Sequence, residues 1–119
     1  MSKFLVRKLD ECHKSHKGYI GGAMFDDSLQ HDQQIEINHN ILPDSFTAPS
    51  HYHSRSKTWV IVLKGAMHFK IEDENIVVNQ GEFLIFDKNV KEEVVRVEPG
   101  TESITIHAPS IKGGDKVSK

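Results

Sequence analysis

Hydrophobic and polar residues alternate over short segments along most of this chain. Met67, Phe69 and Ile71 alternate with polar residues, and Ile35 and Ile37 do the same earlier in the sequence. A period of two is typical of a β-strand with one buried face. Turn-forming residues separate these segments. The pattern predicts short strands at residues 4–9, 19–25, 33–42, 59–63, 67–71, 76–78, 83–86, 90–97 and 103–107.

Strands at this spacing, with turns between them, are typical of a β-sandwich or a closed barrel, so we expect an all-β fold. Residues 59–63 (WVIVL) are apolar at every position, which predicts a central strand buried on both faces. No stretch longer than about ten residues repeats its apolar residues with the helical period. The polar segment 10–17 has no apolar stripe, and no helix is assigned there.

Composition narrows the class of protein. A chain of 119 residues predicts a single domain over residues 1–119, with its core motifs at 35–109 and a loose tail at 110–119. A net charge of −2 provides no basic surface for nucleic acid. No apolar run is long enough to span a membrane, and the first residues lack the apolar core of a signal peptide, so we expect a cytoplasmic protein.

The segment His51-Tyr52-His53 carries the strongest chemical signal. On a strand, residues i and i+2 point to the same face, so the two imidazoles would lie side by side. Two imidazoles on one strand can occupy adjacent positions around one metal ion and leave others for a carboxylate or water. Two solvent-exposed histidines on an edge strand are the alternative.

The residues that follow this pair resemble the first motif of the cupin superfamily. Thr58 and Gly65 stand at the motif's spacing, although Thr58 takes the place of the usual Glu. The second cupin motif is matched in spacing from Gly81 to Glu92, where Glu92 takes the place of the usual His. The closing segment from 97 to 116 resembles the WbuC-type cupins of surface-polysaccharide gene clusters, which carry a similar EPGT turn, final strand and Asp-Lys pair.

This resemblance implies a cupin double-stranded β-helix, which is a jelly-roll barrel with its site between two sheets. It also implies a ligand set of His51, His53 and Glu92 for a divalent metal, which could be Zn, Ni, Mn or Fe. Glu93 replaces Glu92 if the strand register shifts by one residue. Small cupins of this type form homodimers, often by exchange of an N-terminal strand, and 4–9 is the candidate segment.

Three functional hypotheses remain open. The first is a metal-dependent cupin with a small sugar-like or organic-acid ligand. The second is a metal-free sugar-nucleotide isomerase or epimerase, which a resemblance to the dTDP-sugar 3,4-ketoisomerases among the cupins implies. His51 and His53 would be its catalytic acid and base, since histidine exchanges protons near neutral pH. The third is a non-enzymatic binding protein. Thr58 and Glu92 are the positions that distinguish them.

Three further residues could join the site. His107 and His39 share strand parity with residues expected to face inward, and Arg96 shares the expected face of Glu92 and could pair with it. Phosphate-binding glycine loops, nucleophile elbows and paired-cysteine metal motifs do not occur in the sequence, which excludes nucleotide hydrolases, serine hydrolases and zinc fingers.

Overall fold

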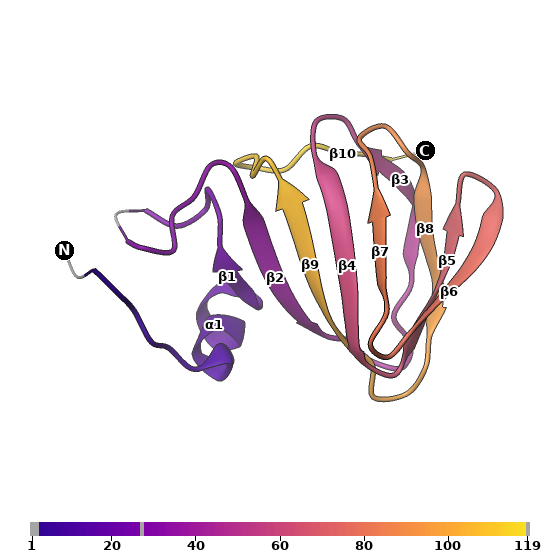
Figure 1. The fold of residues 1–119 in the computed structure, drawn as a ribbon, viewed down its shortest axis with the longest axis horizontal. Helices are drawn as coiled ribbons and strands as arrows, with labels where there is room; N and C mark the ends of the chain where they lie inside the picture. The colour runs from indigo at the N-terminus through magenta and orange to yellow at the C-terminus, as the bar shows by residue number, and fades with distance from the viewer. Residues whose placement is uncertain (1–2, 27, 119) are drawn as a thin grey trace.

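The computed structural model describes residues 3–26 and 28–118, and nearly all of its regular structure is β-strand (Figure 1). The elements in chain order are α1 (Leu9–His16), β1 (Tyr19–Gly21), β2 (Glu36–Ile41), β3 (Ala48–His53), β4 (Lys57–Lys64), β5 (Ala66–Ile71), β6 (Glu74–Asn79), β7 (Phe83–Phe86), β8 (Glu92–Val97), β9 (Glu102–Ala108) and β10 (Lys116–Ser118). The predicted all-β fold is therefore confirmed.

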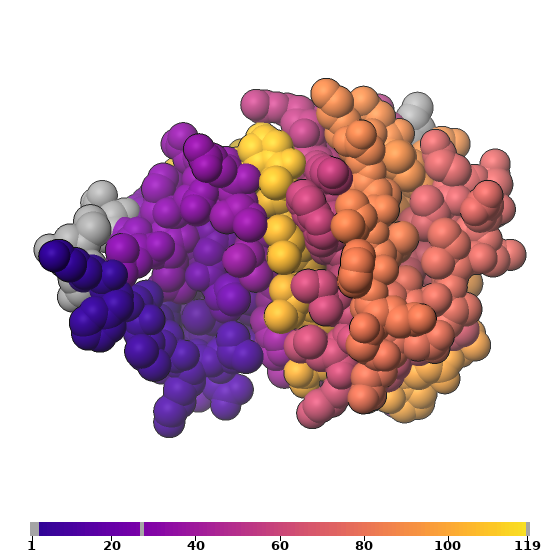
Figure 2. Space-filling view, viewed as in Figure 1, coloured from indigo at the N-terminus to yellow at the C-terminus, as the bar shows by residue number. Residues whose placement is uncertain are grey.

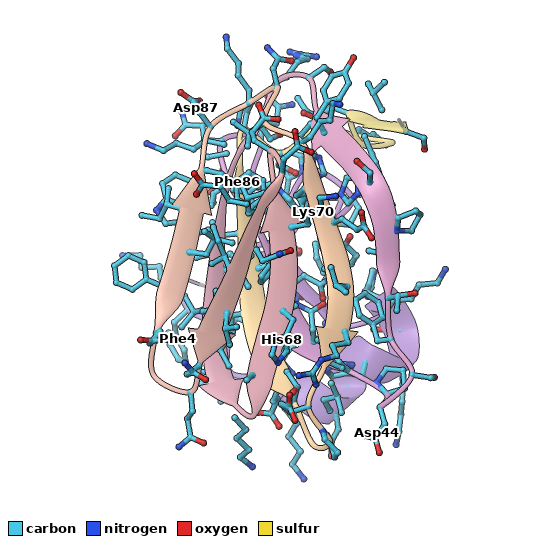
Figure 3. All side chains as sticks on the ribbon, turned by 90° about the vertical axis from the view of Figure 1, so that its right-hand side faces the viewer. Phe4, Asp44, His68, Lys70, Phe86 and Asp87 are labelled. Carbon is cyan, nitrogen blue, oxygen red and sulfur yellow. The ribbon has the colours of Figure 1, made fainter. Side chains whose placement is uncertain are left out.

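The strands form two five-stranded antiparallel sheets that face each other. One sheet has the order β1-β2-β9-β4-β7 and the other has the order β10-β3-β8-β5-β6. Consecutive strands alternate between the sheets in part of the chain, which is the connectivity of a jelly roll. Side chains fill the space between the sheets (Figure 3). The apolar core comprises Val60, Val62, Met67, Phe69, Val78, Phe86, Val94 and Val97.

The core occupies only part of the space between the sheets. Val62 is fully buried and Phe69 is 2% exposed. Further along the same inner faces the side chains become polar, with Thr58 on β4 and Ser103 on β9 both 1% exposed. Buried polar groups of this kind need hydrogen-bonding partners, and they mark the part of the barrel where a site can form.

The residues of WVIVL are buried on one face only, contrary to the prediction of burial on both. Val60 and Val62 face the core, whereas Leu63 is 38% exposed and Trp59 and Ile61 are half-buried. β4 is a central strand, as predicted, between β9 and β7. Trp59, Ile61 and Leu63 make the outer face of β4 apolar, yet no further layer of the described chain covers this face.

The structure corrects two assignments near the N-terminus. Residues 9–16 form helix α1, in which Cys12 is the one buried residue, so no apolar stripe marks it in the sequence. Its first turn is capped because the Glu11 carboxylate accepts a hydrogen bond from the Lys8 backbone N–H. The predicted strand at 4–9 is not formed, since the arm before α1 has no neighbouring strand with which to pair (Figure 1). No described helix is long and apolar enough to cross a membrane.

The C-terminal segment is also more ordered than predicted. Residues 110–119 were expected to form a loose tail, but Lys116–Ser118 form β10, which pairs with β3 at the edge of its sheet. The sequence signal was weak because the strand has only three residues. This pairing brings residues 116–118 beside the two histidines.

The core assignment can be tested with a matched pair of valines. Val62→Ala should lower the free energy of unfolding by about 2 kcal/mol, because two buried methyl groups are lost and a cavity remains. Val95, which is 44% exposed on β8, is the control, and Val95→Ala should change the free energy by less than about 0.5 kcal/mol. Urea denaturation measures both, and equal effects would contradict the assigned core.

Candidate metal centre

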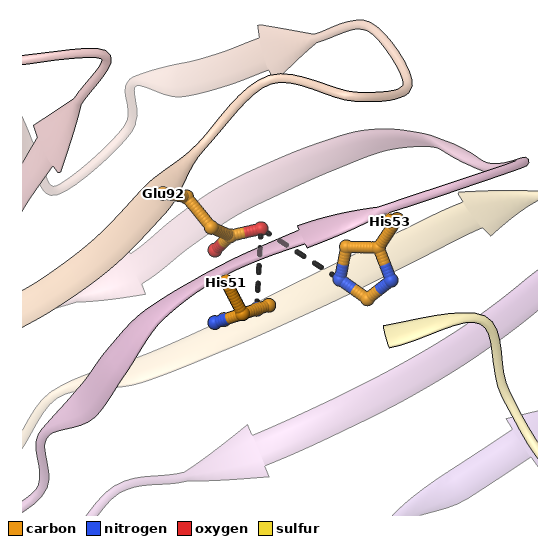
Figure 4. A group of neighbouring side chains, drawn as sticks. All are labelled: His51, His53 and Glu92. Carbon is orange, nitrogen blue, oxygen red and sulfur yellow. Dashed lines mark ion pairs between the residues drawn. The ribbon is translucent and has the colours of Figure 1, made fainter. Parts of the chain in front are cut away.

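Three potential metal ligands meet between the sheets (Figure 4). His51 and His53 lie on the same face of β3, and Glu92 begins β8 directly opposite His51. The Glu92 Oε2 atom lies 3.6 Å from His51 Nε2 and 3.7 Å from His53 Nε2. The side chains are 9% exposed for Glu92, 8% for His51 and 13% for His53. One ligand atom from each residue lies within 4.8 Å of the others, so the group could hold a metal ion.

Both imidazole rings have their Nδ1 atoms occupied by hydrogen bonds. The Nδ1 of His51 lies 2.8 Å from the Pro49 carbonyl oxygen, and that of His53 lies 2.9 Å from Asp115 Oδ1. These oxygens can only accept, so Nδ1 carries the proton in each neutral ring. The Nε2 lone pairs are therefore directed toward Glu92, which is the arrangement that metal-binding histidines require.

The electrostatics of this group favour a cation or a proton at its centre. Burial raises the pKa of Glu92 from 4.5 to about 7, and the positive charge of Lys116 opposes this shift. Burial also lowers the pKa of His51, which keeps its ring neutral. The Nε2 atoms of both rings and a carboxylate oxygen thus converge at one point between the sheets. The residues present fit a divalent ion.

A cavity of about 290 Å³ adjoins the three ligands. The wall from the sheet that contains β4 and β9 is mostly polar, whereas the opposite wall combines the three ligands and Lys116 with apolar side chains. Besides the three ligands, the polar lining residues are Tyr19, Asn40, Thr58, Ser103, Thr105, His107 and Lys116. A larger hollow of about 430 Å³ lies beside the N-terminal arm and α1, and none of the three ligands lines it.

Thr58 does not join the ligand group. It pairs with His107 across β4 and β9, and its Oγ1 atom lies 2.9 Å from His107 Nδ1. The His107 ring lies beside that of His53, with 4.5 Å between the ring centroids. Burial, followed by the nearby His53, lowers the pKa of His107 to about 4, so the ring is neutral near pH 7. His107 therefore lines the cavity, as the strand parity suggested.

Two other candidates lie elsewhere. His39 faces the outside of its sheet, where His13 Nε2 lies 2.8 Å from its Nδ1 and Glu102 Oε2 lies 3.2 Å from its Nε2. Arg96 is 58% exposed and pairs with Glu98 instead of Glu92. The β5–β8 register shifts between His68 and Phe69, so simple alternation from Glu92 fails before Arg96.

The register alternative can also be decided. Glu92 faces the two histidines, and Glu93 pairs with Lys70 on the opposite side of β8. Glu93 lines a surface depression together with Lys70 and Lys91. The register from the cupin-like spacing is thus the one the structure adopts, and Glu93 is not part of the group.

Two residues at the C-terminus were missed. Asp115 contacts His53 as described, and hydrogen bonds hold its pKa at about 2 despite the opposing effect of burial. Lys116 pairs with His53 across β10 and β3, so it shares the inward face and lines the cavity. The Asp-Lys pair of the WbuC-like closing segment was the signal that could have identified them.

Comparisons with known proteins agree with this architecture. Residues 38–96, about half of the chain, match the family model of the cupin domain. No curated protein matches the chain significantly. KdgF from a Halomonas species has a TM-score of 0.64 at 18% identity, over 70% of this chain and 77% of that one.

Two further solved structures have the same fold. A Streptomyces Pac13 variant with uridine has a TM-score of 0.61 at 15% identity, over 72% of this chain and 68% of that one. An RmlC-like cupin family protein with a double-stranded β-helix fold, from Methanocaldococcus jannaschii, has a TM-score of 0.59 at 29% identity, over 68% and 75%. With its two-sheet barrel and its matching family model, this chain belongs to the cupin superfamily.

Proposed function

We propose that the protein binds one divalent metal ion through His51 Nε2, His53 Nε2 and the Glu92 carboxylate, and a small organic ligand in the adjoining cavity. One observation carries the proposal: both histidines commit their Nδ1 protons to other acceptors and direct their Nε2 lone pairs at one buried carboxylate. A buried carboxylate is unfavourable unless a cation or a proton lies beside it.

Two histidines and one carboxylate leave coordination positions open, and Zn, Ni, Mn and Fe all accept this donor set. When bound, such an ion would supply a Lewis acid beside the cavity. The chain's own contribution is to hold three ligands on two paired strands and to limit access of water. His107 lies beside His53 on the polar wall, where its neutral ring can hydrogen-bond a ligand.

The cavity lining supports a ligand that is sugar-like or an organic acid. Asn40, Ser103 and Thr105 offer hydrogen-bonding groups along one wall, which suit hydroxyl groups. Lys116 adds a positive charge at the same cavity, which suits a carboxylate. The Pac13 variant was solved with uridine, so one protein of this fold accommodates a small hydroxylated molecule.

A metal-free catalyst is the second candidate. Thr58 stands where the cupin motif usually supplies a fourth ligand, and its hydroxyl is occupied with His107. In this candidate, His51 and His53 are the acid and base of a sugar-nucleotide isomerase or epimerase, and Glu92 is protonated near its raised pKa of about 7. The third candidate is a binding protein that has the same site but does not convert its ligand.

We also propose a homodimer that covers the outer face of the sheet containing β4, β7 and β9. Phe83 is 66% and Ile85 42% exposed on β7, beside half-buried Trp59 and Ile61. Figure 2 shows this face free of the N-terminal arm. In the N-terminal arm before α1, Phe4 is 77% exposed and Val6 is 88% exposed. The arm can therefore pair with a second copy of the chain.

Metal uptake tests the first proposal. Protein purified without a His tag should take up about one equivalent of Zn, Ni, Mn or Fe per chain. His51→Ala and Glu92→Ala should each weaken binding by more than about 100-fold, because each removes a ligand. Elemental analysis and chelator competition measure this.

His68→Ala is the matched control for metal uptake. His68 lies on β5 and bonds Glu98, away from the cavity, so its loss should leave metal content unchanged. A wild-type protein that takes up none of the four metals would reject the metal proposal and favour the acid–base candidate.

The raised pKa of Glu92 predicts a pH-dependent stability in protein kept metal-free by a chelator. The folded pKa of about 7 exceeds the ordinary value of 4.5, so the folded state retains the proton more strongly. The resulting stability is present at low pH and is lost as the pH rises from 4.5 through about 7. The glutamine in Glu92→Gln does not titrate. The free energy of unfolding of this variant should therefore rise by about 1–3 kcal/mol relative to that of the wild type between about pH 4.5 and pH 8.

Urea denaturation of both proteins at several pH values measures this difference. The opposing loss of stability at low pH from His107, whose folded pKa is lowered from 6.5 to about 4, occurs in both proteins and cancels. A difference that stays constant with pH would contradict the buried, uncompensated carboxylate.

The dimer can be tested by its mass in solution. The wild type should sediment as two chains of 13.5 kDa each. Phe83→Asp should dissociate the dimer, because it places a charge in the proposed apolar interface. Val77→Asp, at a 47% exposed position on β6 of the other sheet, is the control and should leave the dimer intact. A monomeric wild type would reject the proposal.

A further inference from the structure

We propose that Asp115 is a positioning residue of the candidate metal centre, and that β10 is a strap that carries it to His53. The inference rests on the proposed function, since it concerns how one ligand of that centre is prepared. In this proposal Asp115 fixes the tautomer and the orientation of the His53 ring, so that Nε2 presents a lone pair to the ion.

Asp115 is held firmly enough for this role. Its Oδ1 atom accepts a hydrogen bond from His53 Nδ1 at 2.9 Å. Its Oδ2 atom accepts from the backbone N–H groups of Arg55 and Ser56, each at 2.8 Å. The side chain is 7% exposed. With both oxygens occupied, the carboxylate cannot rotate without breaking at least one bond, so the acceptor for His53 stays in place.

The strap makes this contact by pairing with the histidine strand. Lys116 lies opposite His53 and Ser118 opposite His51 in antiparallel register. The Ser54 backbone N–H also donates to the Asp115 carbonyl at 3.1 Å. β10 is the edge strand of its sheet and pairs only with β3 among the described strands. The pairing of β10 with β3 therefore covers the sheet edge beside the ligands and places Asp115 against His53.

The two histidines differ in how they are anchored, and this difference isolates the effect of Asp115. His51 uses the carbonyl of Pro49, two residues earlier on the same strand. His53 uses a side chain 62 residues away in the sequence. A change at Asp115 should therefore alter His53 and leave His51 as an internal reference.

Asp115→Asn is the sharpest variant because it preserves size while removing one acceptor. The single amide oxygen should face the two backbone N–H donors of Arg55 and Ser56. The amide N–H then points at His53 Nδ1, which can only accept it if the ring proton moves to Nε2. The variant thus reverses the tautomer of His53 and directs an N–H, not a lone pair, at Glu92.

Two-bond ¹H–¹⁵N NMR spectra of metal-free protein report the tautomer of each ring. We expect the Nδ1–H form for both histidines in the wild type, and the Nε2–H form for His53 alone in Asp115→Asn. Metal affinity by chelator competition should fall about 10- to 100-fold in the same variant. Asp44→Asn, at an exposed turn, is the matched control and should change neither measurement.

Each outcome decides the proposal. An unchanged His53 tautomer in a folded Asp115→Asn protein overturns it, and so does a reversed tautomer with unchanged metal affinity. If the variant does not fold, the wild-type spectrum still decides, because an Nε2–H form of His53 there contradicts the proposed role. A wild type that binds no metal rejects the proposed function, whereas the tautomer measurement separately shows whether Asp115 sets the His53 ring.

Discussion

The pairing of β3 with its two neighbours is the constraint on which the candidate site depends. β8 on one side places Glu92 opposite His51, and β10 on the other places Lys116 opposite His53. Because side chains alternate along a strand, a shift of one residue in either pairing would turn these groups out of the barrel. Register, more than any single contact, therefore converts distant segments of the sequence into one site.

This register creates an electrostatic problem inside the barrel. Glu92 is buried beside two imidazoles whose protons are used elsewhere, and its raised pKa reflects that cost. The apolar core around Val62 and Phe69 supplies the stability that lets the same two sheets tolerate such a group. A buried carboxylate without a positively charged partner is typical of functional sites and is uncommon in structural cores.

The sequence predicted the parts of this site that depend on local pattern. Alternation on β3 placed His51 and His53 together, and the spacing of the second motif identified Glu92 over Glu93. The sequence pattern could not predict the shifted register between β5 and β8, which turns Arg96 to the surface. Helix α1 was missed because one buried residue leaves no periodicity. Asp115 was missed because it lies 62 residues from His53 in the sequence.

Thr58 shows why a substitution at a motif position need not mean a lost site. A hydroxyl there would be a poor ligand, and in this barrel it is already committed to His107, which fills the space beside His53. The pair adds hydrogen-bonding groups to the polar wall of the cavity in place of a fourth ligand. Because Glu92 stands where the cupin motif usually has His, the proposed centre keeps one carboxylate ligand, and Lys116 adds a positive charge at the same cavity. In the proposed function the exchange of Glu for Thr therefore leaves the charge of the ligand set unchanged, and it is the lysine on the C-terminal strap that favours an anionic ligand.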